Sequence, residues 1–156
     1  MINKIDFPKM GLVRMSLYEK EIKDISKAVA TSMASLSLDK RIKPGQTIAV
    51  TAGSRGIDRL DEVIKSCVDV LKNMGTDPFI FPAMGSHGGA TAEGQKSLLA
   101  HNGISEKKMG VPIHSSMNVS EVGRTQRNVP VYLDQYASNA DALVVINRIK
   151  THTKFE

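Results

Sequence analysis

The residue type best suited to proton transfer lies in a glycine-rich stretch, FIFPAMGSHGGATAEGQ, at residues 79–95. His87 occupies the middle of its loop, and histidine can give or take a proton near neutral pH. The surrounding glycines let backbone N–H groups approach a ligand, and Thr91 is placed to cap a helix whose N-terminus favours anions. The loop is neither GxGxxG nor GxxxxGK[ST], so it predicts an anion-binding corner with a titratable group but identifies no particular ligand.

A second loop of this kind, AGSRG, comes earlier in the chain at residues 52–56. It follows the apolar run TIAVT at 47–51, and Asp58 is placed to cap the helix that comes next. Such loops gather at the carboxyl ends of parallel strands, so Arg55 and His87 are predicted to face one crevice. The candidate cofactor-binding residues of this crevice are Ser54, Gly56, Gly85, Ser86 and Gly88.

Apolar periodicity predicts the elements that position these loops. Residues spaced by three and four predict helices over Met15–Leu38, with Ser16 and Glu19 as a capping box, and over 58–74 and 91–102. Buried strands are predicted at Thr47–Thr51, Phe79–Phe81 and Ala142–Ile146, with a β-hairpin over 119–133. The alternation of strands and helices predicts an α/β fold, a mostly parallel Rossmann-like sheet flanked by helices.

The last predicted strand is followed by a polar and basic loop, NRIKTHTKFE, which contains Lys150, His152 and Lys154. This is the usual position of an active-site loop, and no helix follows to cover the strand. We therefore expect residues 1–156 to be part of an N-terminal α/β domain, with the rest of that domain elsewhere in a longer protein. One face of the sheet at Ala142–Ile146 is expected to be poorly covered.

Composition limits the classes of function. The 156 residues contain one cysteine, Cys67, so an internal disulfide is excluded and a reducing cytoplasm is expected. No apolar run of about 18 residues is present, so no membrane span is predicted. The net charge of +5 is spread along the chain and aromatic residues make up only 4%, which disfavours nucleic-acid binding. A small anionic ligand is compatible with this charge.

Three segments together resemble the lactate racemase family, the nickel-pincer-dependent 2-hydroxy-acid racemases and epimerases. They are AGSRG at 52–56, PAMGSHGGATAEGQ at 82–95 and VINRIKTHTKF at 145–155. The resemblance implies two α/β domains, of which this chain covers most of the first. It also implies a nickel-pincer nucleotide tethered to a lysine, which takes a hydride from the substrate's α-carbon and returns it to either face.

The resemblance assigns the chemistry residue by residue. It implies that His87 and His152 are acid and base on the substrate hydroxyl, one for each enantiomer, and that Arg55 assists in binding the substrate. The residue types suit these roles, because oxidation of an alcohol requires a base and arginine holds a carboxylate with two hydrogen bonds. The substrate is expected to be a small 2-hydroxy acid, and the missing C-terminal half or a neighbouring chain the other partner.

The sequence also departs from the family pattern. The family's cofactor-bearing lysine and nickel-binding histidine correspond to positions beyond Glu156, so no metal ligand, tethered cofactor or turnover is expected of this chain alone. Gly88 stands where the best-known members have an arginine after the loop histidine, which leaves a different or larger hydroxy acid open as the substrate. The alternative is a non-catalytic nucleotide- or anion-binding α/β module.

Overall fold

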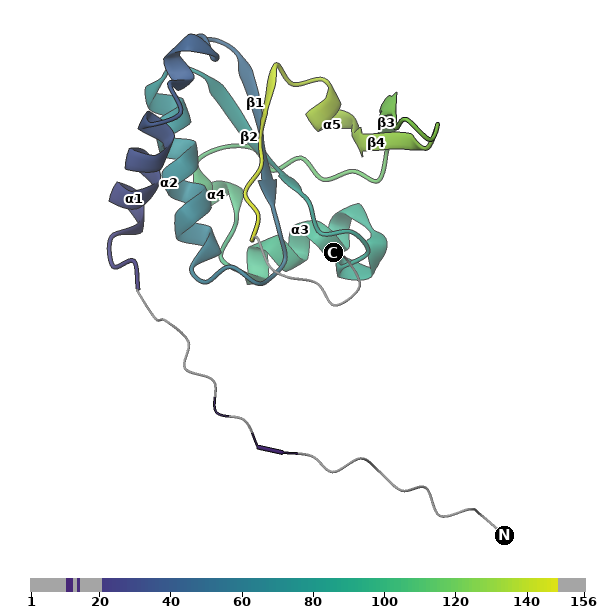
Figure 1. Ribbon diagram of the computed structural model, residues 1–156, viewed down its shortest axis with the longest axis horizontal. Coiled ribbons are helices and arrows are strands. Elements are labelled where there is room, and N and C mark those ends of the chain that lie inside the picture. Colours follow the sequence, from purple (N-terminus) through teal and green to yellow (C-terminus); the bar gives the residue numbers. More distant parts are fainter. Residues whose placement is uncertain (1–10, 13, 15–20, 149–156) are drawn as a thin grey trace.

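The computed structural model describes residues 11–12, 14 and 21–148 and has a parallel three-stranded sheet flanked by helices (Figure 1). The strands are β1 (Thr47–Ala52), β2 (Asp77–Pro82) and β5 (Ala142–Val144), in the order β2-β1-β5. Both neighbours run parallel to β1, with Ala49 opposite Phe79 on one side and Leu143 on the other. The predicted α/β fold is confirmed.

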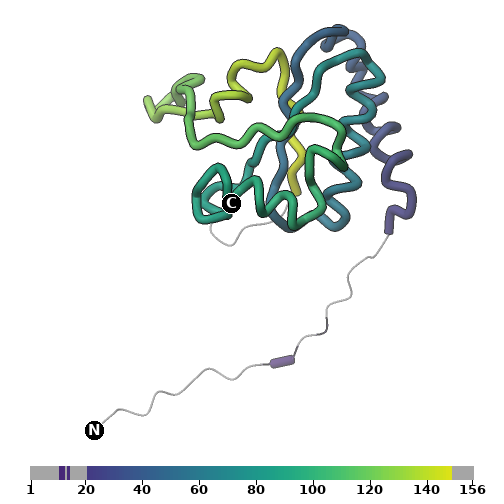
Figure 2. The backbone as a smooth tube through the Cα atoms, turned by 180° about the vertical axis from the view of Figure 1, so that it is seen from behind, coloured from purple at the N-terminus to yellow at the C-terminus, as the bar shows by residue number. Residues whose placement is uncertain are grey.

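The described elements around the sheet are helices and a β-hairpin. The α-helices are α1 (Ile25–Ala34), α2 (Leu60–Asn73), α3 (Ala92–His101), α4 (Glu106–Met109) and α5 (Gln135–Ser138). Short 3₁₀ helices occur at η1 (Leu38–Lys40) and η2 (Gly88–Ala90), and the predicted hairpin consists of β3 (Val119–Arg124) and β4 (Pro130–Asp134). Figure 2 shows the chain after α3 running across to this hairpin, which projects on the side away from α1.

The main core lies between the sheet and the longer helices. Alternate strand residues, among them Ile48, Val50 and Ile80, are fully buried there against apolar side chains of α2 and α3. The other face of the sheet carries a smaller cluster, in which Phe79 and Phe81 pack with Ala137 of α5. Because successive strand residues point to opposite faces, the same short strands supply both clusters.

Helix α2 has the predicted buried stripe. Leu60, Ile64, Cys67 and Leu71 are buried at helical spacing, and Gly75 ends the helix region with a φ of +78°. Burial raises the pKa of the Cys67 thiol to about 11, so the thiol is protonated at neutral pH. Cys67 is therefore an unreactive core residue, as its position in the stripe predicted.

Two helix starts differ from the prediction. Helix α1 begins at Ile25, with Asp24 as its N-cap accepting a bond from the Lys27 amide, and Ile22 is 60% exposed outside it. The predicted cap at Ser16 lies outside the described residues. Arg59, not Asp58, precedes α2, and it has a left-handed backbone with φ 49° and no side-chain cap bond.

Strand β5 is shorter and less buried than its apolar run predicted. Leu143 is 40% exposed and Val145 is 63% exposed. Leu143 lies opposite Ala49, on the face of the sheet that carries the smaller cluster with α5, but neither side chain belongs to that cluster. The expected poorly covered face is thus confirmed. Ile146 lies beyond the strand but stays in register, because its amide donates to Thr51 Oγ1 over 2.8 Å. No helix described in the structure is long and apolar enough to cross a membrane.

Candidate functional site

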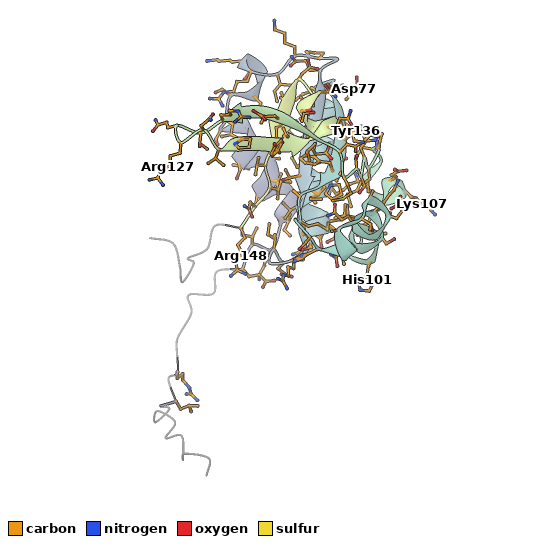
Figure 3. All side chains as sticks on the ribbon, turned by 90° about the vertical axis from the view of Figure 1, so that its right-hand side faces the viewer. Asp77, His101, Lys107, Arg127, Tyr136 and Arg148 are labelled. Carbon is orange, nitrogen blue, oxygen red and sulfur yellow. The ribbon has the colours of Figure 1, made fainter. Side chains whose placement is uncertain are left out.

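A pocket of about 310 Å³ lies at the carboxyl ends of the three parallel strands. We call it the strand-end pocket. It is lined by Gly53, Ser54, Arg55, Gly56, Ala83, Met84, His87, Asn147 and Arg148. These residues come from the segments that follow β1, β2 and β5. In Figure 3, Arg148 and His101 of α3 lie at the end of the molecule opposite Asp77, which begins β2.

The His87 side chain is half-buried and is held by the loop that follows β1. Its Nδ1 lies 2.5 Å from Ser54 Oγ. A hydroxyl can donate to an unprotonated ring nitrogen or accept from a protonated one, so Ser54 is compatible with either tautomer of His87. The other ring nitrogen, Nε2, makes no hydrogen bond within the described part of the chain. The imidazole is therefore fixed at one nitrogen and available at the other.

Helix α3 holds the His87 loop from inside the protein. Gln95 is only 5% exposed, and its Nε2 donates to the carbonyl of Gly85 over 2.8 Å and to that of His87 over 3.4 Å. The loop backbone also lies directly on the first turn of the helix. A Cβ on Gly94 would come within 1.9 Å of Gly88 O, so only glycine permits this approach. Thr91 caps the helix by accepting from the Gly94 amide, as predicted.

Distant segments hold the loop that carries Arg55. Asn102, at the end of α3, donates through Nδ2 to the Ser54 carbonyl over 3.0 Å. From the other side, Arg148 Nη1 donates to the Gly56 carbonyl over 3.1 Å. These bonds join residues 48 and 92 positions apart in the chain. The Arg55 side chain is exposed and lines the strand-end pocket between these two attachments.

The structure thus brings together part of the predicted site. Ser54, Arg55, Gly56 and His87 share the strand-end pocket, as the order of strands and loops indicated. Gly85 borders a different pocket beside the hairpin. Gly88 packs on α3, and Ser86 does not line the strand-end pocket. His152, Lys150 and Lys154 lie outside the described residues.

Sequence reasoning gave no role to several residues that shape the site. Asn147 and Arg148 line the pocket, while Gln95 and Asn102 position its loops. The polar loop after β5 pointed to the first two. Gln95 falls at the end of the quoted glycine-rich motif, where a buried glutamine inside a helix is itself an uncommon feature.

The charge of the pocket lining is one-sided. Two guanidinium groups, those of Arg55 and Arg148, line it, and no Asp or Glu is among its described lining residues. The carboxylate of Asp61 lines an adjacent pocket of about 320 Å³, which shares Ser54 and Arg55 with the strand-end pocket. Lys108 Nζ donates to Asp61 Oδ2 and lowers the pKa of this carboxyl. The strand-end pocket is therefore suited to an anion.

The described residues contain no group of three or more His, Cys, Asp or Glu side chains placed to hold a metal ion. Arginines, a serine hydroxyl and backbone amides bind carboxylates and phosphates, so the donor set suits the anionic parts of a ligand.

A family model described as the lactate racemase N-terminal domain matches residues 8–155. This match spans nearly the whole chain and confirms the resemblance drawn from the three motifs. None of the curated proteins and none of the solved structures matches the chain.

Proposed function

This chain belongs to the lactate racemase family through the N-terminal domain that it matches, and we propose that its strand-end pocket binds a 2-hydroxy acid for racemisation or epimerisation. One observation carries the proposal. His87 and Arg55 line the same pocket, and Ser54 fixes the imidazole at Nδ1. A proton-transfer group and a carboxylate-binding group are the two functions that an alcohol oxidation on a hydroxy acid requires of the protein.

His87 would exchange the hydroxyl proton through Nε2. In one direction Nε2 accepts the proton of the substrate hydroxyl while the α-hydrogen leaves as a hydride, which turns the alcohol into a ketone. In the reverse direction the same nitrogen returns the proton and the alcohol forms again. Because Ser54 can donate to Nδ1 or accept from it, the hydrogen bond persists as the protonation of His87 changes. We propose His152 as the second acid–base group.

Arg55 would bind the substrate carboxylate. Its guanidinium is exposed to the pocket, and its backbone is held by the bonds at Ser54 O and Gly56 O on either side. A guanidinium can hold a carboxylate with two parallel hydrogen bonds, which fixes the orientation of the α-carbon. Orientation of this kind lowers the entropy cost of reaching the transition state.

The family implies a nickel-pincer nucleotide, which supplies a hydride acceptor and donor when bound. The described residues fit its anionic part, because arginine and backbone amides suit a phosphate, and Ser54 and Gly56 are the proposed contacts. They do not supply a set of metal ligands. We therefore place neither the nickel nor the lysine tether on the described residues, and propose that a second domain or chain provides them.

The proposal is tested by replacing His87 with alanine in the cofactor-loaded full-length protein. Racemisation, followed as the interconversion of the two enantiomers, should fall about 10²- to 10⁴-fold, the usual contribution of a positioned acid or base. The matched control is His101→Ala, since His101 is exposed in the last turn of α3 and outside the pocket. Unchanged turnover of every 2-hydroxy acid by the His87 variant would reject the assigned role.

A non-catalytic anion-binding module remains the alternative, because the cationic pocket lining suits an anion without any reaction. The same experiment separates the two. A module would bind anions in the pocket but interconvert no enantiomers of a 2-hydroxy acid in the wild-type full-length protein loaded with its cofactor.

A further inference from the structure

Arg148 is a second cationic side chain in the strand-end pocket, in addition to the Arg55 already given to the substrate carboxylate. We infer that Arg148 binds a second anionic group of the substrate, so that the preferred ligand is a 2-hydroxy dicarboxylate rather than a monocarboxylate such as lactate. This inference rests on the proposed function and adds a substrate class to it.

The position of Arg148 supports this role. Its Nη1 donates to the carbonyl of Gly56, the residue next to Arg55, which keeps the two arginines on neighbouring parts of the pocket wall. A guanidinium has five N–H donors, and the bond to Gly56 uses one of them. The side chain is exposed and makes no ion pair with a carboxylate in the described part of the chain. It is thus held in place while most of its donors face solvent or ligand.

The charge balance of the pocket gives the second argument. One arginine satisfies one carboxylate through a bidentate pair, so a monocarboxylate leaves the second guanidinium without an anionic partner. No carboxylate of the described lining compensates for it. Two guanidinium groups that line one small pocket repel each other, and a dianion bound to both offsets this repulsion. A hydroxy acid with carboxylates at both ends fits this arrangement of charges.

Two other roles for Arg148 make different predictions. As a mere tether of the Gly56 loop, it would affect the binding of every ligand of the pocket equally. As a phosphate-binding residue for a nucleotide, it would bind inorganic phosphate in preference to a dicarboxylate. The choice is therefore decided by the selectivity among anions and not by whether the variant binds less.

The test is a calorimetric titration of the cofactor-loaded full-length protein with lactate, malate and inorganic phosphate at constant ionic strength, on the wild type, Arg55→Gln, Arg148→Gln and Arg127→Gln. Arg127 is the matched control, because it is exposed near the hairpin turn, does not line the strand-end pocket and loses the same charge. Malate should bind about 10-fold tighter than lactate to the wild type, a typical value for one charge-assisted pair. Arg148→Gln should remove this preference, because malate loses more affinity than lactate when the second guanidinium is absent, whereas Arg127→Gln should retain it.

Other outcomes overturn the inference. Equal affinity for malate and lactate, an equal loss for both in Arg148→Gln, or a preference for phosphate would each reject the second-carboxylate role. In those cases lactate binding that depends on Arg55 would still leave the proposed function in place. Failure of both hydroxy acids to bind would reject the inference and the proposed function together.

Discussion

The two glycine loops of the site have the same place in the fold but are held in different ways. Both follow a parallel strand and precede a helix. The backbone of the loop after β2 is held by residues close to it in the sequence, since Gln95 bonds to Gly85 O and Gly88 packs on Gly94. The loop after β1 is held by Asn102 and Arg148, which lie far away in the chain.

This difference separates a loop that is held by nearby residues from one that is held by distant residues. Local contacts form together with helix α3, so the His87 loop gains its shape when that helix forms. The Arg55 loop depends on contacts that close long stretches of chain, and each such closure costs conformational entropy. We therefore infer that the acid–base group is fixed first and that the arginine side of the pocket is the part that adapts to different hydroxy acids.

The largest expected effect comes from replacing Gly94, whose backbone lies against the loop that carries His87. In Gly94→Ala the new methyl group would lie 1.9 Å from Gly88 O, a backbone atom that cannot rotate away. We expect the free energy of unfolding to fall by about 3 kcal/mol, as for severe overpacking. Denaturant unfolding followed by circular dichroism measures this.

Gly123→Ala is the matched control, since a Cβ there meets nothing within 4 Å and its φ is not positive. Its unfolding free energy should stay within about 0.5 kcal/mol of the wild type. Equal stability of the Gly94 and Gly123 variants would show that the loop does not depend on this contact.

An intermediate effect is expected from removing the side-chain hydrogen bonds that hold each of the two loops. Gln95→Ala removes the part-buried hydrogen bonds to the carbonyls of Gly85 and His87 together with a buried side chain, and should cost about 1–3 kcal/mol. Asn102→Ala removes the bond to the half-buried Ser54 carbonyl, which water can partly replace, and should cost about 1 kcal/mol.

Hydrogen exchange distinguishes the two variants beyond their stabilities. Gln95→Ala should speed amide exchange at residues 85–90, and Asn102→Ala at residues 53–57. If each variant loosened both loops equally, the loops would form one cooperative unit and the comparison above would fail.

The sequence predicted what depends on local pattern. The strands at β1 and β2, the Thr91 cap of α3 and the shared crevice of Arg55 and His87 all followed from periodicity and turn residues. The contacts of Asn102 and Arg148 could not be predicted, because they join residues 48 and 92 positions apart and leave no local pattern.

Two predictions differ from the structure, one at the start of α1 and one at β5. The apolar spacing from Met15 onward favoured one long helix, but Asp24 offers the amide of Lys27 a cap, and α1 begins there. The apolar run at 142–146 predicted a strand of five residues, but β5 ends at Val144, and Leu143 and Val145 are exposed on the face that was expected to be poorly covered. Hydrophobicity records the preference of a side chain, while burial depends on which element covers that face of the sheet.

The smallest expected effect concerns the start of α2, directly after the Arg55 loop. Arg59 provides no side-chain cap there, and Asp61 in the first turn instead pairs with Lys108, 47 positions away. The pair is partly exposed, with side-chain exposures of 23% for Asp61 and 50% for Lys108, so solvent screens it. Asp61→Asn should therefore lower the free energy of unfolding at pH 7 by only about 0.5–1 kcal/mol.

The pH dependence identifies the source of this loss. The hydrogen bond from Lys108 lowers the pKa of the Asp61 carboxyl in the folded state, so the carboxylate stabilises the fold fully above the unfolded pKa of about 3.9. This contribution disappears as the pH falls below that value through the folded pKa. The difference between wild type and Asp61→Asn should thus be constant from pH 5 to 7 and should shrink as the pH falls below about 3.9 through the folded pKa. Lys108→Gln removes the ion pair but keeps the interaction of Asp61 with the helix dipole. The double variant should lose little more free energy of unfolding than Asp61→Asn alone. A full, additive loss in the double variant would show that Asp61 acts through the dipole of α2 and not through the distant lysine, and the start of α2 would then be stabilised locally, like the His87 loop.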